Sequence, residues 1–124
     1  MGDRGNIAIQ QPSDGATARV YLYSHWGGSE LPSVLQTALA RKVRWDDPAY
    51  LARIIFDAMT EGEQGEETGY GISTFISDNE HPILVVDCGT QTITVEGGPA
   101  DVKWTFAEFI ALEDPNTIVN ALDS

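Results

Sequence analysis

Cysteine and long apolar runs are scarce in this chain of 124 residues, and each scarcity excludes a class of protein. Cys88 is the only cysteine, so no disulfide can form within the chain, which agrees with a reducing compartment. No apolar run approaches the length of a membrane span, and Met1–Asn6 has neither the basic nor the apolar region of a secretory signal. We therefore expect a cytoplasmic protein that does not bind a membrane.

Basic residues are also few: seven Lys and Arg stand against nineteen Asp and Glu, which leaves a formal charge of −12. Nucleic-acid binding relies on basic patches, so this balance argues against a nucleic-acid partner. Such acidity either keeps a protein dispersed in solution or forms a face that docks on a basic partner protein. The candidate residues for docking fall in one glycine-containing loop: Glu61, Glu63, Glu66 and Glu67.

The apolar content of 42% is enough for one core, and the chain length predicts a single domain over residues 1–124. Two short strands come first, Ile7–Gln10 and Arg19–Ser24, and the turn-forming run Pro12–Gly15 separates them. We expect them to form an antiparallel hairpin. The second strand alternates between two kinds of side chain, with Val20, Leu22 and Ser24 on one face and Tyr21 and Tyr23 on the other.

Two amphipathic helices are predicted after this hairpin. Ser29 is a good N-cap for the first helix, whose apolar residues repeat at helical spacing through Leu31–Leu39. Asp46–Pro48 supplies an aspartate cap and an early proline for the second, where the same spacing continues as far as Met59. The matching apolar stripes predict that both helices pack on one face of a sheet.

The second half of the chain shows the periodicity of β-strands. Strands are predicted at Tyr70–Ser77, Pro82–Asp87 and Gln91–Glu96, and the apolar run Ile83–Val86 is typical of a central strand buried on both faces. Thr105–Glu108 fits a capping box that begins a short C-terminal helix. The order ββ-αα-βββ-α predicts an α+β fold: a single antiparallel sheet of about five strands, with the helical pair and the short helix packed on it.

The strand-to-helix junction at Tyr21–Glu30 gathers the most unusual residues, His-Trp-Gly-Gly among them. An antiparallel hairpin brings the start of its first strand beside this junction, and a helix N-terminus attracts anions. A phosphate or carboxylate could bind here, with an aromatic ring as a stacking surface for a base. Alternatively, the imidazole and indole close the end of the core and the glycines merely form the turn. The candidate ligand-binding residues are Arg4, Asn6, Tyr23, His25, Trp26, Gly27, Gly28 and Ser29.

Other chemistry has weaker support. Cys88 with His25 or His81 and Asp87 supplies the residue types of a nucleophilic site, but one cysteine near a strand end is usually a small buried residue. Neither histidine has a recognised metal-ligand spacing. We predict no catalytic residue, no metal and no cofactor, and the alternative is a small hydrolase in which His25 is the acid or base.

Three segments, Met1–Ile7, Tyr21–Gly28 and Trp104–Ile110, resemble small uncharacterised proteins of bacteriophages and bacterial mobile elements. The resemblance brings no catalytic residues with it. It implies an accessory protein of the host cytoplasm that acts in counter-defence, by binding a host protein or by sequestering a small anionic ligand such as a nucleotide. We therefore expect a non-enzymatic binding protein, and the remaining alternatives are a structural or assembly role and a homo-oligomer that uses Tyr21 and Tyr23.

Overall fold

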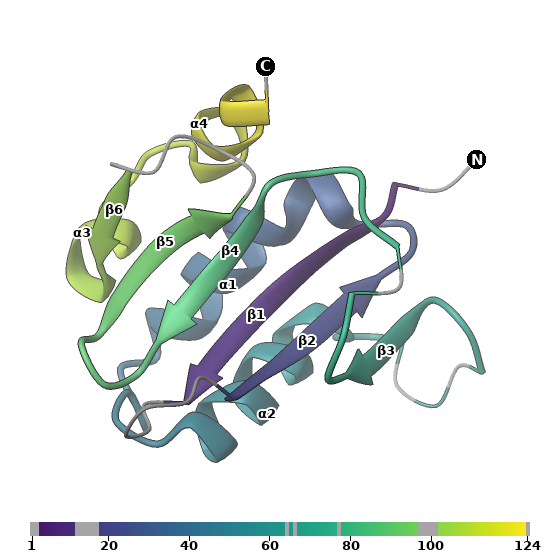
Figure 1. Cartoon of the computed structure of the whole chain (residues 1–124), viewed down its shortest axis with the longest axis horizontal. Coiled ribbons are helices and arrows are strands. Elements are labelled where there is room, and N and C mark those ends of the chain that lie inside the picture. The colour runs from purple at the N-terminus through teal and green to yellow at the C-terminus, as the bar shows by residue number, and fades with distance from the viewer. Residues whose placement is uncertain are drawn as a thin grey trace.

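A mixed sheet of six strands is the centre of the computed structural model, which describes residues 3–11, 18–63, 65, 67–76, 78–96 and 102–123 (Figure 1). The strands lie in the order β3-β2-β1-β4-β5-β6. Neighbours are antiparallel except β1 and β4, which are parallel. The strands are β1 (Gly5–Gln11), β2 (Ala18–Ser24), β3 (Tyr70–Ser73), β4 (Ile83–Asp87), β5 (Thr92–Glu96) and β6 (Lys103–Thr105).

The α+β class is confirmed, but the prediction of a sheet of about five antiparallel strands is wrong in both number and direction. Ile83–Val86 of β4 is buried throughout, as predicted for a central strand. The buried main-chain N–H and C=O groups of such a strand need hydrogen-bond partners on both edges, so it needs a neighbouring strand on each side. On the hairpin, β3 already pairs with β2, so only β1 is available to β4. The chain returns to the end of the sheet where β1 begins, and β4 therefore runs parallel to β1.

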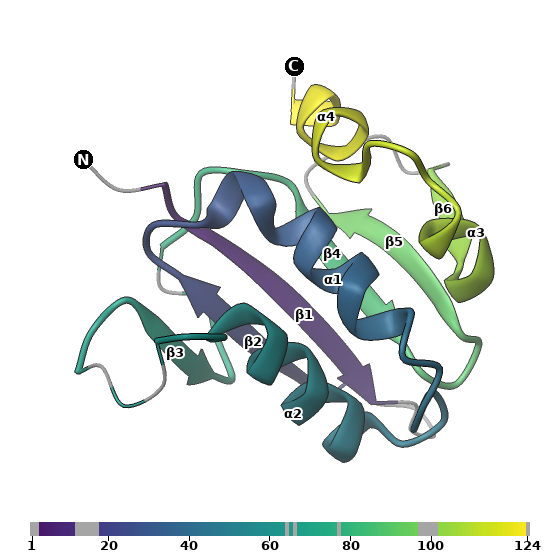
Figure 2. The same cartoon turned by 180° about the vertical axis from the view of Figure 1, so that it is seen from behind.

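Helices α1 (Leu31–Leu39) and α2 (Pro48–Met59) cover one face of the sheet, as predicted (Figure 2). Two short helices, α3 (Phe106–Ile110) and α4 (Pro115–Asn120), follow β6, where one C-terminal helix was predicted; α3 contacts β6, and α4 packs against α1. A 3-10 turn, η1 (Gly28–Glu30), precedes α1, and another, η2 (Ala121–Asp123), follows α4. Within the described residues, no helix is long and apolar enough to cross a membrane.

The helix caps explain where these helices begin. The carboxylate of Asp47 accepts hydrogen bonds from the backbone N–H groups of Ala49 and Tyr50, as predicted for the cap of α2. The predicted capping box of Thr105 and Glu108 is present at α3. The prediction that Ser29 is the N-cap of α1 is wrong. The chain makes the η1 turn before α1, and the hydroxyl of Ser29 donates to the carboxylate of Asp3.

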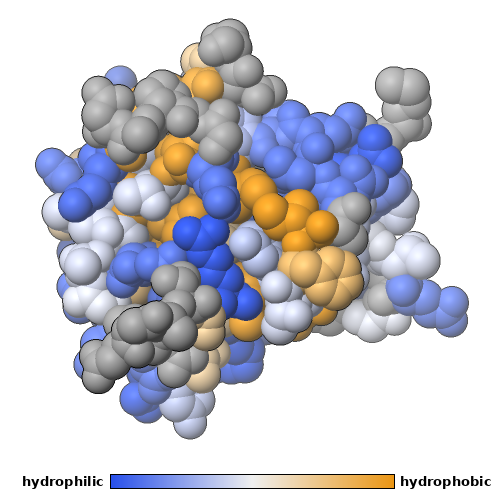
Figure 3. All heavy atoms as spheres, viewed as in Figure 1, coloured by the Kyte–Doolittle hydropathy of each residue, from blue (hydrophilic) through white to orange (hydrophobic). Residues whose placement is uncertain are grey.

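The main core lies between the sheet and the α1–α2 pair. Leu22 of β2 joins it, while Tyr21 faces the opposite side of the sheet and packs with a small apolar cluster, so the predicted alternation of this strand is confirmed. No described helix covers that opposite side, and apolar residues are visible there between hydrophilic ones (Figure 3). The cluster on the helix-free side consists of Ala8, Ile83 and Val85.

Strand β3 ends earlier than predicted, at Ser73 instead of Ser77, which lies outside the described residues. The hydroxyl of Ser73 donates to the carbonyl oxygen of Phe75 and turns the chain away from the sheet. Phe75 is consequently 64% exposed, and Ile72 within the strand is 61% exposed. β3 pairs with Tyr21–Ser24 alone, so the first residues of β2 extend beyond it.

Candidate functional site

The hairpin places the N-terminal residues Asp3–Asn6 against the junction Tyr23–Ser29, and we call these two segments together the His25 corner. Gly5 pairs with Ser24 in the β1–β2 ladder. Beyond the ladder, the N–H of Asp3 donates to the carbonyl oxygen of His25 at 2.8 Å, and the N–H of Gly28 donates to that of Asp3 at 2.7 Å. The predicted proximity of Arg4 and Asn6 to the junction is therefore confirmed.

The close approach of these two segments explains Gly28 of the junction. A Cβ at Gly28 would lie 2.7 Å from the carbonyl oxygen of Asp3 and 2.8 Å from the carbonyl carbon of Arg4, closer than real Cβ atoms come. The N–H of Gly27 donates to the hydroxyl of Ser24 at 3.0 Å, where a Cβ would also be tight. Gly28 thus lets two backbones touch, and Gly27 leaves room for the Ser24 hydroxyl.

The cation and the amide that were predicted to hold an anion already have partners in the chain. Arg4 forms ion pairs with Asp78 at 2.8 Å and with Glu80 at 3.3 Å. Its backbone N–H and guanidinium both bond to Glu80, and these bonds hold the pKa of that carboxyl below its ordinary value. The buried side-chain amide of Asn6 donates to the carbonyl oxygen of Asp78 at 2.7 Å.

The start of the helical segment is likewise occupied, by the carboxylate of Asp3. Ser29 donates to it twice, from its N–H at 3.1 Å and from its hydroxyl at 2.5 Å, and Nε2 of His81 contacts the other oxygen. Partial burial raises the pKa of Asp3, but the bonds from Ser29 and His81 outweigh burial and hold this pKa below its ordinary value. An anion of the protein itself therefore stands where an external anion was predicted.

The aromatic part of the corner is more open. The hydroxyl of Tyr23 lies 2.8 Å from Nδ1 of His25, and the rings of His25 and Trp26 meet edge to face at 5.2 Å. Trp26 is 57% exposed and packs on Gly69, where a Cβ would lie 2.5 Å from the indole. The other ring nitrogen of His25, Nε2, has no hydrogen-bond partner in the described part of the chain. Ligand binding at this corner stays a prediction.

The acidic loop lies beside the start of β3. Glu61, Glu63 and Glu67 are exposed, and Glu66 falls outside the described residues. Glu63 accepts a hydrogen bond from the hydroxyl of Tyr70, and this bond to a carboxylate raises the pKa of Tyr70 to about 12. This bond ties the loop to the sheet, as does the hydrogen bond from the N–H of His25 to the carbonyl oxygen of Gly69, and the loop's role in docking a partner stays a prediction.

The residues considered for catalysis lie apart. Cys88 is buried and directly follows the last residue of β4. His81 precedes the first residue of β4, and His25 lies with His81 at that opposite end of the sheet. Burial raises the pKa of Cys88 to about 11, so its thiol is protonated at neutral pH. No group of three His, Cys, Asp or Glu side chains that could hold a metal is found in residues 3–11, 18–63, 65, 67–76, 78–96 and 102–123.

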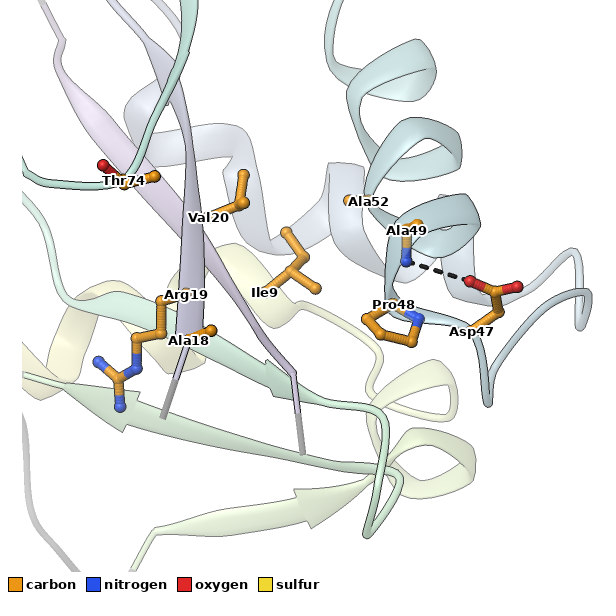
Figure 4. A pocket seen from close by; sticks show the side chains of 9 residues that line it. All are labelled: Ile9, Ala18, Arg19, Val20, Asp47, Pro48, Ala49, Ala52 and Thr74. Atoms are coloured by element: carbon orange, nitrogen blue, oxygen red, sulfur yellow. Dashed lines mark hydrogen bonds between the residues drawn. The ribbon is translucent and has the colours of Figure 1, made fainter. Parts of the chain in front are cut away.

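A hollow of about 550 Å³, which the sequence did not predict, lies at the other end of β2 from the corner (Figure 4). The first turns of α2 form one wall, and the beginning of β2 forms the other. Figure 4 shows Ile9 and Val20 between β2 and α2, while the guanidinium of Arg19 points away. The apolar lining consists of Ile9, Ala18, Val20, Pro48, Ala49 and Ala52.

A second hollow of about 210 Å³ continues the first along α2. The two share Val20, Ala49 and Ala52, and the second reaches Phe56 and the exposed Ile72 of β3. We call this continuous depression the α2 groove. Ala49 and Ala52 are one helical turn apart, and because their side chains are small, α2 leaves space above the sheet. An alanine pair on a second face of this helix is the sequence signal that could have indicated the groove.

The arginines that line the α2 groove are paired with carboxylates. Arg19 pairs with Glu96 at 2.7 Å, and Arg53 pairs with Asp57 at 2.6 Å. Both arginines that line the groove are therefore neutralised by carboxylates. At the α2 N-terminus, Asp47 lines the groove and Asp46 precedes it in the sequence, and no ion pair to either is present in the described residues. The guanidinium of Arg44 lies 4.7 Å from the ring centre of Tyr50 on the same helix.

Comparison with protein-family models, curated proteins and solved structures finds no match for this chain. Functional inference therefore depends on the geometry of the corner and the groove alone.

Proposed function

We propose that this protein is a non-enzymatic binding protein that holds an apolar segment of a partner protein in the α2 groove. The observation that carries the proposal is the groove itself: two joined hollows with predominantly apolar walls, open to solvent beside the exposed side chain of Ile72. Concave apolar surfaces of this kind are typical binding sites, and covering one isoleucine side chain contributes about 2 kcal/mol.

Charge complementarity favours a partner segment that carries lysine or arginine. The chain has a formal charge of −12, and the two arginines at the groove are already paired. A basic segment would approach Asp47 at the groove without meeting an unpaired arginine among the groove's own lining residues, although Arg44 stacks on the ring of Tyr50 nearby. A basic partner segment is also attracted by the net negative charge of the protein, which would repel an anionic ligand.

A protein partner is favoured over a small anion by the state of the His25 corner. Arg4 is paired with two carboxylates, and the N–H of Ser29 bonds to Asp3. An incoming phosphate would have to displace these internal carboxylates before it could bind. The α2 groove needs no such exchange, because an apolar side chain enters it without breaking a hydrogen bond.

A peptide selection tests the proposal. The full chain is immobilised, and a library of random heptapeptides flanked by lysines is enriched on it, after which the affinity of the enriched peptide is measured by fluorescence polarisation. We expect aliphatic residues to be enriched, and we expect A52W, which fills the groove, to weaken binding at least about tenfold, or 1.4 kcal/mol. The more exposed variant A49W should have the same effect.

The matched control is A107W, which places the same indole on an exposed position of α3 outside the groove. This variant should bind the peptide as the wild type does. Failure to enrich any peptide, or equal binding by A52W and the wild type, would contradict a binding role for the groove.

A further inference from the structure

The first residues of β2 form an uncovered edge of the sheet beside the α2 groove. β3 pairs with Tyr21–Ser24, and Ala18–Val20 pairs only with β1 among the described residues. Successive residues of a strand direct their N–H and C=O groups to alternate sides. Some main-chain groups of Ala18–Val20 therefore point outward with no described strand beside them, which is a template for the addition of another strand.

The register of β3 shows where the side chains of an added strand would lie. Ile72 stands opposite Leu22, and both line the groove on the α2 side of the sheet. A residue in line with β3 and opposite Val20 would be two positions further on, so its side chain would lie on the same side and face Ala52. The strand would thus place alternate side chains in the groove.

The described part of the chain does not fill this position. Thr74 is the next residue after β3, but Ser73 bonds to Phe75 and the backbone leaves the sheet there. Thr74 lies at the wall of the hollow instead of pairing with β2. The space in line with β3 therefore combines an apolar hollow with main-chain donors and acceptors that pair with no other described strand.

We propose that the partner segment binds in an extended conformation, as a short strand added to Ala18–Val20 in line with β3. An aliphatic side chain opposite Val20 enters the α2 groove, and lysine or arginine in the flanks lies toward Asp46. This inference rests on the proposed function and names the segment's conformation. Main-chain hydrogen bonds supply affinity, and the groove selects the side chain at alternate positions.

N-methylation of the enriched heptapeptide tests strand addition, because a methyl group removes one main-chain donor and leaves the side chains unchanged. Each amide of the peptide is methylated in turn, and binding to the full chain is measured. We expect losses of about tenfold or more at alternate positions only, since alternate amides face β2. Hydrogen exchange on the complex should show new protection of at least one amide in Ala18–Val20.

The outcomes separate the two proposals. If methylation is tolerated at every position while A52W still abolishes binding, strand addition is wrong and binding in the groove stands. If neither change affects binding, both are wrong. A stable dimer whose Ala18–Val20 amides are already protected in the free protein would overturn strand addition by a partner, because a second copy would cover the edge. Alternating losses together with new protection support the proposal.

Discussion

The His25 corner and the α2 groove lie at opposite ends of β2, and they differ in how their polar groups are satisfied. At the corner, conspicuous residues bond to one another: Arg4 to two carboxylates and Ser29 to Asp3. The groove is made of ordinary residues such as Val20 and Ala52, yet it is open and adjoins a strand edge that pairs with no further strand of the described chain. An unusual run of residues thus marks a crowded junction, and plain ones surround the space available to a partner.

The largest expected effect distinguishes these two ends by stability. In G28A the new methyl group meets backbone atoms of Asp3 and Arg4, which side-chain motion cannot relieve. We expect the free energy of unfolding to fall by about 3 kcal/mol, the upper range for overpacking. Urea unfolding followed by circular dichroism measures the change.

The matched control for this substitution is G71A in β3, where a Cβ would meet its nearest neighbour, the ring of Tyr23, at an ordinary 3.9 Å. Its effect on stability should be within about 0.5 kcal/mol. The folded fraction of G28A should bind the enriched peptide normally, because the groove is remote. A stable G28A protein would show that the corner tolerates separation of its two backbones.

Much of the corner could be predicted from the sequence because it depends on local rules. The alternation of β2 and the hairpin fixed which residues face each other, so Arg4 was placed correctly beside the junction. Its ion pairs were not predictable, because Asp78 and Glu80 reach it from a distant loop. Where a side chain lies follows from periodicity, whereas what it bonds to follows from tertiary packing.

The end of β3 and the direction of β4 could not be predicted for a related reason. The alternating sequence favours a strand that continues beyond Ser73. The hydrogen bond from the Ser73 hydroxyl to the carbonyl oxygen of Phe75 favours a turn instead. The parallel pairing of β1 and β4 depends on which edge is free after β3 has docked. The α2 groove depends on this early end of β3 as well as on the small side chains of Ala49 and Ala52, so the alanine pair could indicate only part of it from the sequence.

A smaller effect tests whether the charge of Asp3 holds the corner together. Its pKa is lowered in the folded state, so its contribution is complete above the unfolded pKa of about 4 and is lost as the pH falls through the lower folded pKa. We expect D3N to cost about 1 kcal/mol at pH 7, because the carboxylate is partly exposed. Below pH 4 the difference from the wild type should shrink, as urea unfolding across pH would show.

D46N is the control for the acid series, because Asp46 is exposed and forms no ion pair within the described residues. Its stability should follow that of the wild type at every pH. If D3N is as stable as the wild type at pH 7, the bonds of Ser29 and His81 to the Asp3 carboxylate contribute nothing to the free energy of unfolding.

The smallest expected effect concerns the charge at the groove. Asp46 lies in the sequence beside the α2 cap, so D46N should weaken the lysine-flanked peptide about twofold, or 0.4 kcal/mol, and added salt should reduce the difference between D46N and the wild type. Fluorescence polarisation at low and high ionic strength measures both effects. E108Q, which removes one charge on α3, should leave the peptide's affinity unchanged. Equal weakening by both variants would mean that the −12 charge acts as a diffuse field over the whole protein, so that the groove alone, and not its acidic rim, selects the partner.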